Sequence, residues 1–200
     1  NIAKGATQNY TATWTAAGTT GTYTVAVGVF GANWTPNYHW NNNAASLTVI
    51  GSDTAQYNFE SSAQGWLSSG GMITGVASSS GKAFMGSKSL AVSIKSTKSE
   101  TQQALVKAPA TPAGKTITFH IWFPSGSTIT SVQPYVLQGS GGGWKWTGNW
   151  QSTANLTPNA WNTLQVTVPT DAVTPLDSLG VEFSTNGAWT GVCYIDTVGW

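Results

Sequence analysis

The strongest constraint on this chain is the alternation of apolar and polar residues in short runs. Clusters of Gly, Pro, Asn and Ser separate the runs, as turns between strands require. No segment keeps a helical spacing of apolar residues over three turns. The sequence therefore predicts an all-β fold, a sandwich or barrel of many short strands. The runs are GTYTVAVGVF (21–30), KSLAVSIKS (88–96), KTITFHIWF (115–123), SVQPYVLQ (131–138), WNTLQVTVP (161–169), LGVEFST (179–185) and GVCYIDTV (191–198).

A change in composition near residues 50–54 (IGSDT) predicts a domain boundary. Residues 1–50 hold two or three strand patterns, and residues 55–200 start a new series that opens with YNFES and closes with YIDTVGW. The first segment alone is too short to bury a good core. We therefore expect a partial module over 1–50, a linker over 51–54 and a complete module over 55–200.

Charge and cysteine content exclude several classes of protein. The formal net charge is +1, all eight basic residues are Lys, and nucleic-acid binding needs clustered cations. The sequence contains no run of 18 apolar residues, which is the length that a membrane-spanning helix needs. The single cysteine, Cys193, excludes an intramolecular disulfide and a cysteine-built metal site. A nearly neutral chain with 11 Trp and many hydroxyl side chains is typical of secreted, extracellular proteins that handle polysaccharide.

Motifs for catalysis are absent from the sequence. It contains no G-x-S-x-G elbow, H-E-x-x-H, P-loop or dinucleotide fingerprint. Glycoside hydrolysis needs two carboxylates, and the seven acids are scattered along the chain. A small all-β glycoside hydrolase or lyase that uses Glu182 is the alternative to a binding module, and a structural spacer with buried aromatics is a third.

Strand alternation predicts a ligand-binding face. In KTITFHIWF the apolar set at 117, 119, 121 and 123 is assigned to the core, so His120 and Trp122 point outward. Pyranose rings present C–H patches to aromatic faces, and their hydroxyls need amide or carboxylate partners. Burial in the core is the competing interpretation for each Trp. We expect one groove, with His120 at its edge, lined by Trp122, Gln133, Tyr135, Trp144, Trp146, Trp150 and Glu182.

Two acids at the ends of the second module predict a cation site. Glu60 lies in the first strand pattern and Asp196 in the last, and the first and last strands of a sandwich are often neighbours. Calcium takes carboxylate and backbone carbonyl oxygens. The two carboxylates could therefore share a calcium ion.

Residues 55–200 resemble the β-sandwich carbohydrate-binding modules of bacterial cellulases and mannanases. The resemblance rests on YNFESSAQGW (57–66), GSKSLAVS (86–93), VQPYVLQGSGGGWKWTGNW (132–150), AWNTLQVTVP (160–169) and LGVEFSTNGAWTGVCYIDTVGW (179–200). It implies a jelly-roll-like sandwich that binds single β-1,4-glucan or mannan chains in a shallow cleft. It also implies a structural Ca²⁺ at Glu60 and Asp196, with backbone carbonyls from the loop that contains Lys88.

Residues 1–50 are similar to the second half of an immunoglobulin-like accessory module, through GTYTVAVGVFGANWTPNYHWNNNAASLTV (21–49). Such modules flank catalytic and binding domains in secreted enzymes. The two resemblances together imply a non-catalytic module that targets a secreted glycoside hydrolase to glucan, mannan or xyloglucan. The partners expected are the polysaccharide and a covalently linked catalytic domain.

Overall fold

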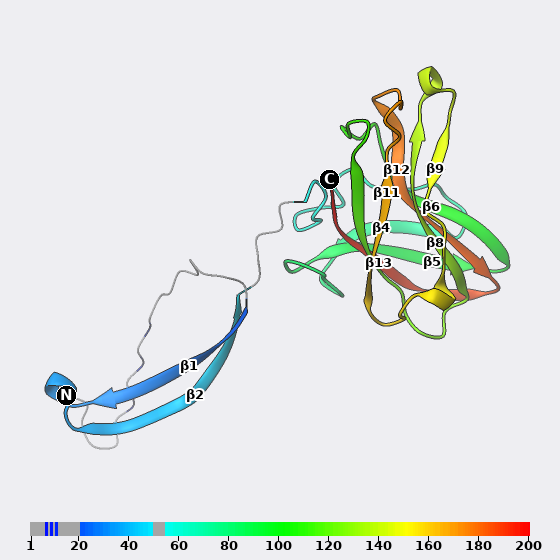
Figure 1. Cartoon of the computed structure of the whole chain (residues 1–200). Helices are drawn as coiled ribbons and strands as arrows, with labels where there is room; N and C mark the ends of the chain where they lie inside the picture. The colour runs from blue at the N-terminus through cyan, green and yellow to red at the C-terminus, as the bar shows by residue number, and fades with distance from the viewer. Residues whose placement is uncertain (1–6, 8, 10, 12–20, 50–54) are drawn as a thin grey trace. The chain divides into compact units, whose positions relative to one another are not determined.

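The computed structural model describes residues 7, 9, 11, 21–49 and 55–200, and its chain divides into two compact units, Asn1–Gly51 and Ser52–Trp200 (Figure 1). The predicted linker 51–54 lies outside the described residues. Among the described residues, the regular structure consists of strands and three short 3-10 turns. No helix in the described part of the chain is long and apolar enough to cross a membrane. The predicted all-β class is confirmed.

The second unit is a sandwich of two antiparallel sheets. We call them the β7 sheet, with strand order β11-β7-β13-β5-β4, and the β8 sheet, with strand order β10-β8-β12-β6-β3 and β9 also paired to β8. The strands are β3 (Leu67–Ser68), β4 (Ile73–Ser79), β5 (Ser89–Ser96), β6 (Ser99–Lys107), β7 (Thr116–Trp122), β8 (Ile129–Gln138), β9 (Trp146–Gly148), β10 (Gln151–Ser152), β11 (Trp161–Thr167), β12 (Leu176–Asn186) and β13 (Trp189–Gly199).

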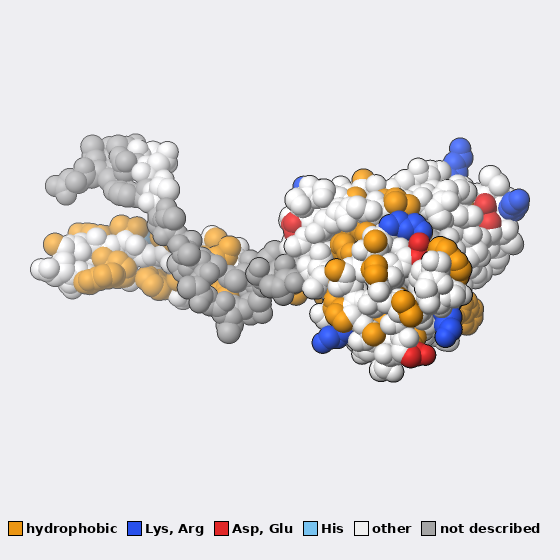
Figure 2. Space-filling view, turned by 90° about the horizontal axis from the view of Figure 1, so that it is seen from above, with side chains coloured by type: hydrophobic (Ala, Val, Ile, Leu, Met, Phe, Trp, Pro, Cys, Tyr) orange, Lys and Arg blue, Asp and Glu red, His pale blue; other side chains and the backbone are white. Residues whose placement is uncertain are grey.

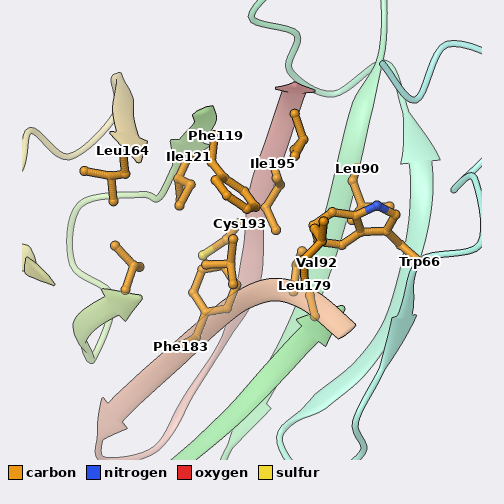
Figure 3. Packing of buried hydrophobic residues seen from close by; sticks show 14 of the residues in the cluster. Trp66, Leu90, Val92, Phe119, Ile121, Leu164, Leu179, Phe183, Cys193 and Ile195 are labelled. Carbon is orange, nitrogen blue, oxygen red and sulfur yellow. The ribbon is translucent and has the colours of Figure 1, made fainter. Parts of the chain in front are cut away.

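One hydrophobic core lies between the two sheets (Figure 3). The β7 sheet contributes Phe119 and Ile121, and the β8 sheet contributes Leu179 and Phe183, all fully buried. Each of these residues occupies an alternate strand position, so its neighbours in sequence point away from the core. Trp66 is also buried here, which settles the position of one tryptophan that the sequence left open.

The two ends of the second unit meet, as the sequence predicted. Tyr57 and Val198 form an antiparallel bridge in which each backbone N–H donates to the other's carbonyl at 3.0 Å. This bridge brings the segments that contain Glu60 and Asp196 to the same end of the sandwich. The second unit is therefore closed by its own first and last segments. Its single core can hold a binding face in a fixed geometry.

The described part of the first unit is one antiparallel hairpin of β1 (Gly21–Phe30) and β2 (Asn37–Val49), joined through the 3-10 turn Ala32–Trp34. The strands form a long curved ribbon (Figure 1). Apolar side chains are exposed along it (Figure 2). Because the described strands form only this one pair, the resemblance to an immunoglobulin-like module stays a prediction.

Candidate functional site

The predicted groove residues lie on two different sheets. Strands β7 and β8 follow one another in the chain, but β7 pairs with β11 and β13 while β8 pairs with β12, β9 and β10. Outward-facing residues of the two sheets therefore lie on opposite sides of the core. The prediction of a single groove that includes His120 and Trp122 is wrong. Gln133, Tyr135, Trp146 and Glu182 belong to the β8 sheet.

On the β8 sheet, Trp146 stacks on Tyr135. Their ring centroids are 3.9 Å apart and their planes differ by 9°. Tyr135 is almost fully buried beneath the indole, whereas Trp146 keeps 42% of its surface exposed. A Cβ added to Gly148 would lie 2.2 Å from Gln133 Nε2 and 2.8 Å from Trp146 Nε1, so both polar groups lie over that glycine. Gln133 and Trp146 thus form one contiguous surface, and Tyr135 supports the indole from beneath.

A row of polar side chains crosses the same face. Glu182 of β12 is paired in register with Gln133 of β8 and with Gln103 of β6. Gln103 Nε2 donates a hydrogen bond to Glu182 Oε2 at 2.6 Å. The row offers amide donors and carboxylate acceptors, which are the partners that hydroxyl groups of a ligand require.

Gln103 was missed by the sequence argument. In SETQQALVK (99–107) the three successive apolar residues 104–106 obscure the alternation. The signal that remains is the register of β6 against β12, which only the folded sheet supplies.

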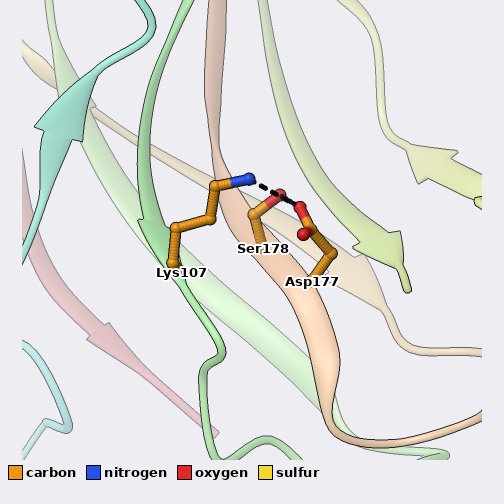
Figure 4. A network of polar contacts seen from close by, with 3 residues as sticks. All are labelled: Lys107, Asp177 and Ser178. Carbon is orange, nitrogen blue, oxygen red and sulfur yellow. Dashed lines mark hydrogen bonds and ion pairs between the residues drawn. The ribbon is translucent and has the colours of Figure 1, made fainter. Parts of the chain in front are cut away.

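Tyr135 is linked to a polar network of Ser178, Asp177 and Lys107, and Figure 4 shows these three residues. The hydroxyls of Tyr135 and Ser178 share a hydrogen bond, and Ser178 Oγ donates to Asp177 Oδ2 at 3.0 Å. Lys107 Nζ contacts the same oxygen at 2.8 Å. Burial raises the pKa of Tyr135, the Ser178 hydrogen bond opposes this rise, and the charges of Glu182 and Asp177 add to it. The phenol therefore stays neutral and fixed beneath Trp146.

Two further tryptophans are exposed on the hairpin that follows β8. Trp144 and Trp150 each keep 58% of their surface accessible. The turn before Trp144 is glycine-rich, and Gly143 and Trp144 adopt φ of 68° and 57°. A left-handed backbone suits glycine but costs a bulky residue about 1–2 kcal/mol. Such strain is concentrated at binding and catalytic sites, which favours a role for the exposed indole of Trp144.

His120 and Trp122 lie on the outer face of the β7 sheet beneath the loop before β5. Phe84 of that loop stacks on His120 with centroids 3.6 Å apart. Lys82 Nζ lies 5.0 Å from the Trp122 ring centroid, and Tyr194 contacts the same indole edge-on. His120 is buried and Trp122 is partly buried, so both contribute to packing of this loop. Strand phase identified their outward direction and could not identify their sheet.

Glu60 and Asp196 hold opposite ends of one short segment, residues 84–88. Asp196 Oδ2 accepts hydrogen bonds from the N–H groups of Phe84 (2.7 Å) and Met85 (3.2 Å). Glu60 Oε1 accepts them from Ser87 (2.8 Å) and Lys88 (2.9 Å). Burial acts to raise the pKa of Glu60, but hydrogen bonds from Ser87 and Lys88 and the Lys88 charge outweigh it, so the pKa is lowered.

This arrangement fits a calcium ion in the kind of donors it brings together. Two carboxylates from distant strands converge on one loop, which contains Lys88, and calcium prefers such oxygen ligands. The loop now directs N–H groups toward both carboxylates, and a bound ion would have to displace them. Within the described residues no cluster of three or more His, Cys, Asp or Glu side chains is present.

The two carboxylates of β12, Glu182 and Asp177, are too far apart to act as the paired carboxylates of a glycosidase. Glu182 and Asp177 are five positions apart on one strand, or about 17 Å at the rise of an extended chain. Paired carboxylates of glycosidases lie about 5–10 Å apart. Asp177 is also held by Lys107, whose hydrogen bond and charge lower its pKa despite partial burial. Hydrolysis with these two groups as acid and nucleophile is therefore not supported.

The fold is similar to those of solved carbohydrate-binding modules. The chain matches, with a TM-score of 0.68 and 27% identity, a structure from work on the promiscuous specificity of carbohydrate-binding modules of the β-sandwich superfamily, covering 91% of this chain and 74% of that one.

Two more distant matches agree with the fold. Module CBM27-1 of Caldicellulosiruptor saccharolyticus, solved with mannohexaose, matches with a TM-score of 0.56 at 16% identity over 71% of this chain and 93% of that one. Module CBM28, specific for non-crystalline cellulose, matches with a TM-score of 0.53 at 17% identity over 72% and 90%.

No family model matches the sequence, and no curated protein matches it either. The structural matches are to binding modules, which favours a binding module over an enzyme. The sandwich with its exposed tryptophans, and the solved structures that share its fold, show that this chain resembles the carbohydrate-binding modules of the β-sandwich type.

Proposed function

We propose that residues 55–200 bind a single β-1,4-linked chain of glucan, mannan or xyloglucan on the outer face of the β8 sheet. The observation that carries the proposal is the Trp146–Tyr135 stack beside the row of Gln133, Glu182 and Gln103. An aromatic surface with a few fixed polar groups is the usual form of a sugar site. The matched modules that bind mannohexaose and non-crystalline cellulose support this class of ligand.

The biological role we propose is targeting. The chain would be part of a secreted, extracellular glycoside hydrolase, a cellulase or mannanase, with a catalytic domain linked covalently to it. Holding the enzyme on polysaccharide raises the local substrate concentration without lowering a chemical barrier. The low charge and tryptophan content of the sequence support this context.

Affinity electrophoresis tests the proposal directly. Gels that contain hydroxyethyl cellulose, galactomannan or xyloglucan should retard the chain, and a gel without polysaccharide should not. No retardation by any of the polymers would overturn the proposal in favour of a structural spacer. Release of reducing sugar from the same polymers would instead support the alternative in which Glu182 is catalytic.

We also propose a structural calcium ion held by Glu60, Asp196 and the backbone carbonyl of Lys88. The support is the convergence of both carboxylates on the 84–88 segment. An ion that binds only the folded state raises its stability by mass action. Calcium should therefore raise the melting temperature and a chelator should lower it, while sugar affinity stays the same. Identical melting curves would mean that the N–H groups alone hold the loop.

A further inference from the structure

The end of the first unit's hairpin carries a cluster of aromatic side chains. We call Phe30, Trp34, Tyr38 and Trp40 the tip cluster. Trp34 and Tyr38 keep 78% and 67% of their surface exposed. Phe30 lies between the two indoles, with its ring centroid 5.1 Å from Trp34 and 6.0 Å from Trp40, in edge-on contacts. Phe30, Trp34 and Trp40 therefore form one group of contacting rings, and Tyr38 is the exposed aromatic residue two positions before Trp40 on β2.

The tip cluster lies on the face of the hairpin opposite the valines. Trp40 is paired in register with Gly28, and a Cβ added to Gly28 would lie 2.4 Å from the Phe30 ring and 2.5 Å from the Trp40 ring. Both rings thus cover this glycine. Val27 and Val29 alternate with Gly28 along β1 and point to the other face. A layer packed on the valines would leave the tip cluster accessible.

The backbone at the tip repeats a feature of the β8 face. Asn33 and Trp34 have φ of 56° and 64°, and Gly143 and Trp144 have φ of 68° and 57°. In both places two successive left-handed residues follow or end a 3-10 turn and leave a tryptophan exposed. Such a conformation costs a bulky residue energy, and in both places the residue that bears the cost is an exposed tryptophan.

The surroundings of the tip cluster select an uncharged ligand. Residues 21–49 contain no Lys, Arg, Asp or Glu. Asparagines at 33, 37, 41 and 42 flank the rings, together with Thr35 and His39, which is paired with Val29 on the other face. Trp40 Nε1 donates a hydrogen bond to Asn42 Oδ1. Aromatic faces with amide groups suit the C–H patches and hydroxyls of a neutral sugar and offer nothing to an ionic one.

We infer that the tip cluster is a second contact site for a neutral polysaccharide, separate from the β8 face. This inference rests on the proposed function of residues 55–200. Two sites on one chain that engage the same polymer increase the apparent affinity without strengthening either contact. The expected ligand is the polymer that the β8 face binds, because a long chain of repeating sugars can be contacted at two separate sites.

Variants of the full chain test the inference by affinity electrophoresis in hydroxyethyl cellulose and galactomannan. W34A/Y38A should weaken retention by at least about tenfold, which is less than the roughly 10²–10⁴-fold that a fully engaged second site can add. H39A is the matched control, because His39 is exposed at the same end of β2 but is paired with Val29 on the opposite face. In a W146A/W150A background, residual retention should remain and should disappear when W34A/Y38A is added.

The outcomes separate the two proposals. If the parent chain is retained by no polymer, both fail. If the parent chain is retained and both W34A/Y38A and H39A are retained to the same extent as the parent, the second site alone is overturned. Light scattering adds a third outcome: a parent dimer that W34A/Y38A converts to a monomer, with retention per chain unchanged, would identify the tip cluster as an interface between copies and overturn the inference.

Discussion

Trp146 and Trp122 both point outward from a strand, but their surroundings give them different roles. Trp146 is supported by the Tyr135 ring and keeps one indole face open. Trp122 is covered by Lys82 and contacts Tyr194 edge-on. An open, supported ring can stack on a sugar, whereas a covered ring stabilises the loop above it.

Replacing Trp146 by Ala should therefore weaken polysaccharide binding by about 1–3 kcal/mol, the scale of one lost aromatic contact and its buried area. Trp122→Ala is the matched control and should leave binding within about twofold, because its indole lies on the other sheet. Isothermal titration with a soluble glucan or mannan oligosaccharide measures both. Circular dichroism should show that both variants fold. Equal losses for the two variants would contradict the placement of the site on the β8 sheet.

Asp177 links the support of Tyr135 to pH. Its pKa is lowered through Lys107, so its contribution to stability is present above the ordinary carboxyl pKa and is lost as the pH falls through the lowered value. Lys107 is exposed and Asp177 is partly buried, so solvent screens the pair and the contribution should be about 1 kcal/mol or less. Urea unfolding of the parent and Asp177→Asn should differ slightly at pH 7 and converge near pH 2. A difference that grew on acidification would contradict this sign.

Alternation along the strands predicted much of the side-chain orientation correctly. The residues 117, 119 and 121 are in the core, and Gln133 and Glu182 face outward as neighbours. What alternation cannot give is the sheet to which each strand belongs. That depends on pairing between segments far apart in sequence, such as β6 with β12, and so His120 was misplaced and Gln103 was missed.

At the scale of elements, the 84–88 segment depends on two carboxylates of very different exposure. Asp196 is fully buried, whereas Glu60 is only partly covered. Asp196 accepts N–H groups of Phe84 and Met85 with one oxygen and of Thr197 with the other. In Asp196→Asn the NH₂ group takes the place of one carboxylate oxygen, and at either position it would face a backbone N–H donor. A buried donor left without an acceptor costs about 1–3 kcal/mol.

Asp196→Asn should thus destabilise the fold by about 1–3 kcal/mol. Glu60→Gln should cost under about 1 kcal/mol, because water can reach this partly exposed side chain and replace the lost contacts. Chemical denaturation in the presence of a chelator isolates this effect from any metal. Neither variant should change sugar affinity, since both acids lie outside the β8 face. A larger loss for Glu60→Gln would contradict the order of burial.

The hairpin after β8 shows how far local sequence determines an element. GSGGGW (139–144) predicts a turn, because glycine tolerates the left-handed backbone that Gly143 adopts. The same letters do not reveal that Trp146 lies on Tyr135, because that contact needs β9 to pair with β8 in the register Tyr135 to Gly148. Turn chemistry is local, and ring stacking across strands is not.

At the scale of the whole molecule, the core and the proposed sugar site are both made within one unit. The core cluster is drawn entirely from residues after Tyr57, and its ends are joined by the Tyr57–Val198 bridge. A unit of this size buries enough surface to fold alone. The hairpin of the first unit exposes valines on one face and aromatic rings on the other, and a two-stranded piece is marginally stable by itself.

Deleting residues 1–53 should therefore leave the remaining chain folded, with an unchanged melting temperature and an unchanged affinity for a short oligosaccharide. Retention by a long polymer should fall by the same factor that W34A/Y38A produces, because deletion and substitution remove the same contact. Differential scanning calorimetry, titration with the oligosaccharide and affinity electrophoresis measure the three quantities. Loss of folding on deletion would show that the first unit supplies part of the core. A fall in oligosaccharide affinity with folding intact would place part of the sugar site outside residues 55–200.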